Sequence, residues 1–239
     1  QGKVADRLEL RATLRQLAGE RFDVLAEQYP FANTLVRQAQ RKALSDQLDK
    51  LLQLDWDVRQ RRFVAVERSF GYDEPCQLET DSGPLFVRGK IDKLDLAGSR
   101  LLVRDIKTGA GKPRRADSPP ELDIDLQLGL YALVAKRMAK HWKTPSDVGV
   151  AYLYLRSGEP LRSWIGDDYP QLEAAVLEWL AIARETLESG AFVRSPQPED
   201  CRYCPYQPVC APEMPRAQQV LDDPEVPSRL AVLKGGEAR

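Results

Sequence analysis

The run Leu85–Leu94 (LFVRGKIDKL), followed closely by Leu101–Ile106 (LLVRDI), decides the fold of this chain. Both runs are short and rich in apolar and β-branched residues, which is typical of strands. Ala97-Gly98-Ser99 between them has the composition of a hairpin turn. We therefore expect two neighbouring strands joined by a tight turn.

The acidic side chains of this hairpin indicate a metal site. Side chains alternate along a strand, so Asp105 and Lys107 share one face, and Asp92 on the partner strand can reach it. Two carboxylates can hold a hard divalent cation, which activates water and neutralises charge on a phosphate. Lys107 beside the cation can orient that water or offset the oxyanion. The arrangement predicts metal-assisted cleavage of a phosphodiester.

The alternative is that these are ordinary surface residues, because an isolated D-x-K triplet is common by chance. The ordered set of motifs, however, resembles the RecB/AddB-like branch of the PD-(D/E)XK nuclease superfamily. The matching residues are Glu67 in Val64–Glu67, the G-x-x-D of Gly89 to Asp92, the D-x-K-T-G of Asp105 to Gly109, and the Q-L-x-x-Y of Gln127 to Tyr131. The resemblance extends from about Glu67 to Cys210.

By this resemblance, Asp92, Asp105 and the backbone carbonyl of Ile106 bind Mg²⁺ or Mn²⁺, and Lys107 is the catalytic lysine. Gln127 and Tyr131 are implied as a substrate-side pair, and a spacing of four residues puts them on one helix face. Taken alone, the two residues favour interpretation as ordinary helix residues. Glu67 either joins the site or faces solvent.

A histidine on a helix well before the first acid is usual in this branch and is not found here. The only histidine, His141, follows the Gln127 helix and is interpreted as a surface or helix-end residue. Either the chain lacks the motif, or the motif lies upstream of Gln1, which we expect because the sequence does not begin with methionine.

Three cysteines form a second motif, Cys201-x-x-Cys204 followed after five residues by Cys210. Thiolates at this spacing bind zinc or an iron–sulfur cluster. The resemblance implies a structural 4Fe–4S cluster that clips the C-terminal tail onto the core, with an upstream fourth ligand. That ligand is either Cys76 or a residue before Gln1. Reduced thiols without metal, or a disulfide, remain alternatives.

Net charge is −1, so any contact with DNA must rely on local patches. Lys112, Arg114 and Arg115 follow the D-x-K-T-G strand and are candidates for phosphate binding, although such runs are usually solvated surface. No apolar run approaches the length of a membrane span, and nothing marks the chain as secreted. We expect a cytoplasmic protein.

The segment order predicts an α/β, restriction-endonuclease-like fold with a mixed sheet flanked by helices. We expect a helical segment at 1–60, a nuclease core at 61–195 and a cysteine-containing tail at 196–239. Two core-facing helices are predicted at Asp6–Tyr29 and Phe31–Trp56. Further predicted elements are strands at Phe63–Phe70 and Val148–Leu155, a short strand around Trp164, and helices at Leu122–Lys140 and Tyr169–Leu187.

The leading hypothesis is a metal-dependent DNA nuclease, expected to be an exonuclease within a helicase–nuclease of double-strand-break repair and recombination. No G-x-x-x-x-G-K-[ST] loop is present in the sequence, so an ATP-dependent helicase would be another segment or subunit. The alternatives are a stand-alone CRISPR-adaptation-type exonuclease, a non-catalytic nuclease-fold module that binds DNA or acts as a scaffold, and a zinc-stabilised interaction domain.

Overall fold

The computed structural model describes residues 7–56, 61–109, 111, 114, 118–156, 159–190 and 204–210. The chain divides into two compact units. The first comprises Gln1–Leu78 and Phe86–Val176, and the second comprises Glu79–Leu85 and Leu177–Arg239. Every residue predicted for the catalytic metal site belongs to the first unit.

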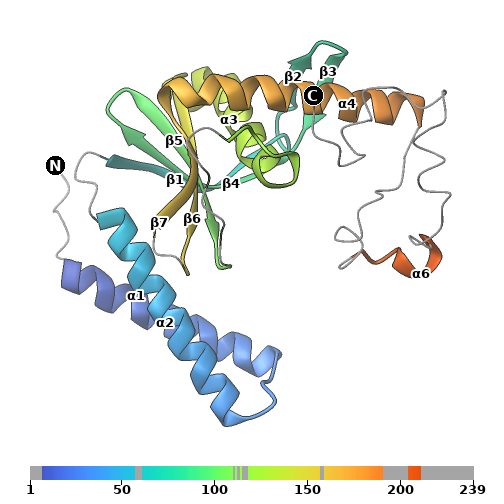
Figure 1. The fold of residues 1–239 in the computed structure, drawn as a ribbon. Coiled ribbons are helices and arrows are strands. Elements are labelled where there is room, and N and C mark those ends of the chain that lie inside the picture. Colours follow the sequence, from blue (N-terminus) through green and yellow to red (C-terminus); the bar gives the residue numbers. More distant parts are fainter. Residues whose placement is uncertain are drawn as a thin grey trace. The chain divides into compact units, whose positions relative to one another are not determined.

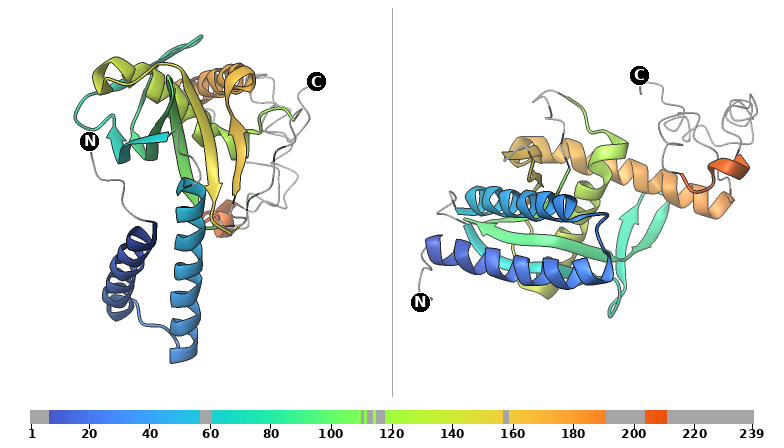
Figure 2. Two further views of the ribbon diagram at one scale, coloured as in Figure 1. Left: turned by 90° about the vertical axis from the view of Figure 1, so that its left-hand side faces the viewer. Right: turned by 90° about the horizontal axis from the view of Figure 1, so that it is seen from below.

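Two long helices, α1 (Arg7–Gln28) and α2 (Thr34–Trp56), form a hairpin and lie side by side in both views of Figure 2. Charged side chains join them at two points: Arg11 and Arg15 contact Asp49, and Arg37 and Arg41 contact Asp23. The predicted helices are confirmed. The expectation that both face the core is wrong for α1, which has no buried residue and leaves Leu8 71% exposed.

A mixed sheet forms the centre of the first unit, and among the described residues its strand order is β1-β4-β5-β6-β7 (Figure 1). Its strands are β1 (Arg61–Phe70), β4 (Gly89–Ala97), β5 (Arg100–Lys107), β6 (Val148–Tyr154) and β7 (Glu159–Trp164). Neighbours are antiparallel except β5 and β6, which are parallel. A parallel pair needs a crossover, and α3 (Leu122–Trp142) supplies it.

The predicted single strand Leu85–Leu94 is wrong. Gly83–Val87 is β3, which pairs with β2 (Cys76–Thr80) in a separate two-stranded sheet, whereas β4 begins at Gly89. Arg88-Gly89-Lys90 interrupts the apolar run at the break, but an interruption this short does not reveal that the two halves pair with different partners.

The core of the first unit lies between α3 and the sheet, because α3 packs on β5 and β6. Fully buried side chains from both layers meet there: Leu94, Leu101, Val103, Val150, Leu128 and Val134. Gly129 lets α3 pack closely against Val176, since a Cβ at position 129 would lie 2.1 Å from Cγ2 of this valine. The predicted mixed sheet flanked by helices is confirmed.

The remaining elements are the short helix η1 (Gly166–Asp168), α4 (Tyr169–Ser189) and α6 (Gln207–Cys210). The predicted helix at Tyr169–Leu187 is confirmed, and Gly190 after it has a φ of 68°, a conformation that favours glycine at a helix end. Within the described part of the chain, none of the helices combines the length and apolar character that crossing a membrane requires.

Candidate active site

Two carboxylates meet where β4 and β5 pair. The register sets Lys93 opposite Arg104, and its continuation sets Asp92 opposite Asp105. Oδ2 of Asp92 accepts a hydrogen bond of 2.9 Å from the backbone N–H of Ile106. This bond holds the Asp92 carboxylate against the strand that carries Asp105.

Asp105 is a buried acid, with only 2% of the residue exposed. Burial raises the pKa of its carboxyl group, Lys107 opposes that shift, and the charge of the nearby Asp92 adds to it. The two carboxylates are therefore close enough for their charges to interact. A nearby cation favours the charged form of a buried acid that lies next to another acid.

Lys107 links β5 to α3. Its Nζ lies 2.7 Å from Oδ2 of Asp105 and donates a hydrogen bond of 2.7 Å to Oε1 of Gln127. Nε2 of Gln127 in turn donates to the hydroxyl of Tyr131 at 3.0 Å. The structure thus brings together the lysine and the helical pair that the sequence motifs singled out.

Gly89, the first residue of the G-x-x-D motif, has a packing role. A Cβ there would lie 2.8 Å from Cζ of Phe70, and the Phe70 ring meets the Tyr131 ring edge-on with centroids 6.1 Å apart. The glycine therefore admits an aromatic ring that supports Tyr131.

Glu67 lies on β1 beside β4 but does not point its charge at Lys107. Its φ is 51°, an uncommon conformation for a residue with a side chain. Its carboxylate forms an ion pair with Lys90, and its side chain is 58% exposed. The structure thus favours the solvent-facing alternative for Glu67.

Tyr152 of β6 is a neighbour of the site that the sequence motifs did not identify. Its ring centroid lies 5.0 Å from Nζ of Lys107, and its hydroxyl donates to the carbonyl of Ile124 at 2.7 Å. Burial, with the Asp105 charge adding to it, raises the pKa of Tyr152. An aromatic residue in a buried strand carries no local signal for such a role, because its contact with Lys107 arises only from the β5–β6 pairing.

An open cavity of about 610 Å³ adjoins Lys107. Its described lining is mostly apolar and aromatic: Leu122, Ile124, Leu126, Tyr152 and Tyr154, with Lys107 and Gln127 as the polar members. A pocket of this size and character can take a small organic group beside the lysine.

The basic segment after β5 differs from the expectation of free phosphate-binding side chains. The side chain of Arg114 is 6% exposed; its guanidinium stacks 3.6 Å from the centroid of the Trp164 ring and pairs with Asp168 at 3.3 Å. These contacts favour a structural role for Arg114 and not the predicted DNA contact. Lys112 and Arg115 lie outside the described residues.

The predicted cluster ligands are only partly described. Cys201 lies outside the described residues, Cys204 is a half-buried free cysteine, and Cys210 ends α6 without a described side chain. Cys76 is 1% exposed in β2, and burial raises the pKa of its thiol. A buried neutral thiol fits the interpretation of Cys76 as a small core residue.

His141 lies in the last turn of α3, as expected for a helix-end residue. Its side chain is 53% exposed, and its Nδ1 lies 3.5 Å from Oε2 of Glu74. No contact of His141 with Lys107 is found among the described residues, and His141 does not correspond to the histidine that the family carries before the first acid.

The chemistry of the donor set fits a divalent cation. Oδ2 of Asp105 is buried, and although Lys107 lies close enough for an ion pair, no described group meets this oxygen with hydrogen-bond geometry. A buried carboxylate oxygen with a spare lone pair is a ligand suited to Mg²⁺ or Mn²⁺. Among the described residues, no three His, Cys, Asp or Glu side chains gather at one point.

Comparison with known proteins agrees with this geometry. The model of the PD-(D/E)XK nuclease superfamily matches residues 2–211 of the chain. No curated protein matches the chain.

Proposed function

Since the chain belongs to the PD-(D/E)XK nuclease superfamily, we propose that it is a divalent-metal-dependent DNA nuclease domain that hydrolyses phosphodiester bonds. The observation that carries the proposal is the contact of the Lys107 ammonium with buried Asp105, on the strand paired with the one that bears Asp92. An acid pair beside a held lysine suits phosphoryl chemistry better than it suits a purely structural role.

In this proposal, Asp92, Asp105 and the backbone carbonyl of Ile106 hold Mg²⁺ or Mn²⁺. Such an ion, when bound, lowers the pKa of its water and offsets the negative charge that develops on the phosphate. The burial of Asp105 removes competing water from one side of the site, which strengthens the interaction of its carboxylate with a cation.

Lys107 is the proposed catalytic residue beside the phosphate. Its hydrogen bond to Oε1 of Gln127 fixes the direction of the ammonium, and Tyr131 supports the amide of Gln127 by accepting its N–H. The Nζ protons are then oriented to donate a hydrogen bond to a non-bridging phosphate oxygen or to the attacking water. Gln127 and Tyr131 act through Lys107 as positioning residues.

We further propose that the domain acts as an exonuclease within a helicase–nuclease of double-strand-break repair, with the ATP-dependent motor on another segment or subunit. The RecB/AddB-like order of Gly89, Asp92, Asp105, Lys107 and Gln127 supports this choice. A stand-alone CRISPR-adaptation-type exonuclease and a non-catalytic DNA-binding module are the alternatives, and the experiment below separates the non-catalytic module from a nuclease.

The three C-terminal cysteines support a second part of the proposal, a structural 4Fe–4S cluster on Cys201, Cys204 and Cys210. Binding of a cluster would stabilise a tail that has little apolar periodicity of its own. Anaerobically purified protein should then absorb visible light at about 400 nm, as iron–sulfur clusters do. A colourless protein with stoichiometric zinc contradicts the cluster.

The decisive experiment is digestion of labelled linear and circular DNA, single- and double-stranded, with Mg²⁺, Mn²⁺ or EDTA. We expect metal-dependent digestion of linear DNA that is lost in Asp92→Ala and Lys107→Ala. Asp46→Ala is the matched control, because Asp46 is an exposed acid of α2 whose ion-pair partner, Lys42, lies on the same helix. Digestion of circular DNA would indicate an endonuclease, and equal digestion by all variants, or none by the wild type, excludes the nuclease.

A further inference from the structure

Tyr72 is an exposed aromatic residue two positions after Phe70, which pairs with Gly89, three residues before Asp92. It is 63% exposed and follows β1 in a bend. The preceding Gly71 has a φ of 75°, and a Cβ there would lie 2.1 Å from the carbonyl oxygen of Val87. This close approach presses the bend against the segment that enters β4 and places the Arg88 guanidinium 5.8 Å from the centroid of the Tyr72 ring.

Lys90 connects this aromatic ring to the metal site. Alternate residues of a strand share a face, so Lys90 and Asp92 lie on one side of β4, and Arg88 immediately precedes the strand. Lys90 forms an ion pair with the Glu67 carboxylate and lies two residues before Asp92 on the strand. The β1–β4 register pairs Lys90 with Ser69, three residues before Tyr72, so the lysine links the end of β1 to the strand that carries the acid.

A hollow of about 430 Å³ adjoins Tyr72 and has aromatic walls. Phe70, Tyr72 and Trp142 line it, and the guanidinium of Arg68 lies 5.3 Å from the centroid of the Trp142 ring. Phe70 also contacts Tyr131, the last member of the Lys107 network. A group in this hollow would thus lie one side chain away from the proposed catalytic network.

More negative than positive side chains line this hollow. Glu67, Asp73 and Glu74 line it together with Arg68 and His141, and Lys90 is already paired with Glu67. Attraction of phosphate alone therefore cannot supply much binding here. A nucleobase can bind, because its flat face stacks on aromatic rings and is tolerated by nearby arginine. In a duplex the neighbouring bases cover these faces, so the group must be unpaired.

We propose that Tyr72, with Arg88 and Lys90, forms a subsite that holds an unpaired nucleotide of the DNA strand beside Asp92, with its base stacked on Tyr72. This inference rests on the proposed nuclease function for its substrate and adds a preference for single-stranded or frayed ends. Lys90 exchanges its contact with Glu67 for one with the phosphate of the stacked nucleotide.

The test is binding without cleavage, measured by fluorescence anisotropy in EDTA. The probes are a short labelled oligothymidylate and an abasic oligonucleotide of the same length, which carry the same charge but differ in their bases. We expect the wild type to bind oligothymidylate about tenfold more tightly than the abasic probe, the order of effect of a stacked base. Tyr72→Ala should bind both equally, and Tyr72→Phe should keep the difference.

Tyr29→Ala is the matched control, because Tyr29 is 72% exposed and follows α1. It should leave the discrimination unchanged. The subsite is excluded when the wild type fails to prefer bases, or when Tyr72→Ala, with an unchanged melting temperature, retains the preference. Because no metal is present, this outcome is independent of the digestion assay, in which an inactive wild type contradicts the nuclease itself.

Discussion

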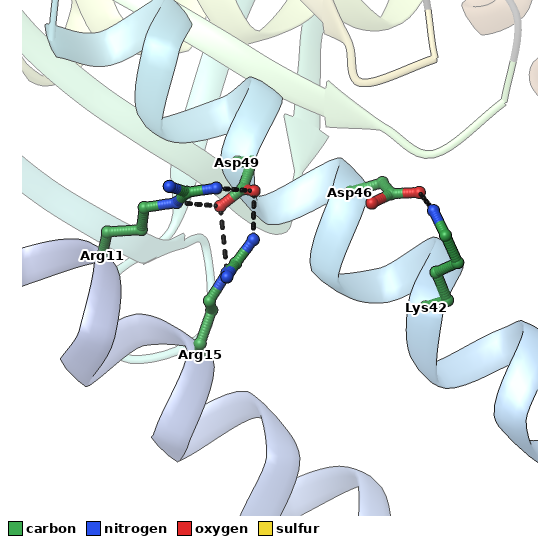
Figure 3. A network of polar contacts seen from close by, with 5 residues as sticks. All are labelled: Arg11, Arg15, Lys42, Asp46 and Asp49. Atoms are coloured by element: carbon green, nitrogen blue, oxygen red, sulfur yellow. Dashed lines mark hydrogen bonds and ion pairs between the residues drawn. The ribbon is translucent and has the colours of Figure 1, made fainter. Parts of the chain in front are cut away.

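Asp49 in the α1–α2 hairpin and Asp105 in the sheet both lie against cationic side chains, yet their pKa values move in opposite directions. Arg11, assisted by Arg15, lowers the pKa of Asp49 well below its usual range (Figure 3). Burial raises the pKa of Asp105 even though Lys107 lies 2.7 Å away. The side chain of Asp49 is 25% exposed and that of Asp105 only 3%.

The difference shows that access to water, rather than the presence of a partner, decides what an ion pair does. Near the surface, a pair keeps most of its hydration and gains a little attraction. In the interior, the lost hydration exceeds the attraction of one lysine. The charge of Asp49 therefore favours folding, whereas the charge of Asp105 opposes it. A buried charge that lowers stability is consistent with a role in binding a metal ion.

Asp105→Asn tests this comparison most strongly. We expect nuclease activity to fall about a thousandfold or more, because a metal-binding charge that stabilises the transition state is lost. The free energy of unfolding should be unchanged or higher, since the buried negative charge is removed. Digestion of labelled DNA and urea-induced unfolding measure the two effects.

Mg²⁺ provides a readout that does not depend on catalysis. A ligand that binds only the folded state raises the melting temperature, so Mg²⁺ should stabilise the wild type but not Asp105→Asn. Asp46→Asn, at the exposed pair with Lys42 in Figure 3, should behave like the wild type in both assays. A marked loss of stability in Asp105→Asn would show that its charge supports the fold, and would break the comparison.

Asp95 and Arg104 sharpen the comparison, because they form a pair that is buried on both sides. They are 2% and 3% exposed, and Lys93 lies 3.1 Å from the same carboxylate. Asp95→Ala removes the acid and leaves two cationic groups in a desolvated region. We expect the free energy of unfolding to fall by about 3 kcal/mol, measured in urea.

Asp46→Ala is the exposed counterpart and should change the free energy of unfolding by no more than about 0.5 kcal/mol. Similar losses in the two variants would mean that burial does not govern these pairs. A small loss in Asp95→Ala alone would indicate that water reaches the Arg104 guanidinium in the variant.

The sequence predicts those parts of the fold whose signals are local. Alternation and the turn at Gly98 place Asp92 opposite Asp105, and the helical spacing of Gln127 and Tyr131 puts them on one face. These contacts depend on one hairpin and one helix, so their geometry follows from the periods of strand and helix. The break between β3 and β4 escapes prediction because it depends on which distant strand each half pairs with.

The parts that escaped prediction are contacts between distant segments. Arg114 has the appearance of a free basic residue in the sequence, but it stacks on Trp164, which is fifty residues further along the chain. Tyr152 reaches Lys107 only because β6 pairs in parallel with β5 after the α3 crossover. No local composition signals either contact, since both arise from the order of strands in the sheet.

Asp49→Asn has the smallest expected effect and tests the more exposed of the compared carboxylates. At neutral pH we expect the free energy of unfolding to fall by about 1 kcal/mol or less, because the pairs with Arg11 and Arg15 are partly solvated. The pKa of Asp49 is lower in the folded state than the usual value of about 3.9 in the unfolded chain. Its contribution is therefore complete well above pH 4 and is lost as the pH falls through the folded-state pKa.

Urea unfolding of the wild type and Asp49→Asn across acid and neutral pH measures this dependence. The difference between the two proteins should be constant at neutral pH, shrink below about pH 4 and decrease in high salt. Nuclease activity should not change, because Asp49 lies in the helical hairpin. A difference that persists in acid would assign the effect to packing of the side chain, and Asp49 would then no longer be the charged opposite of Asp105.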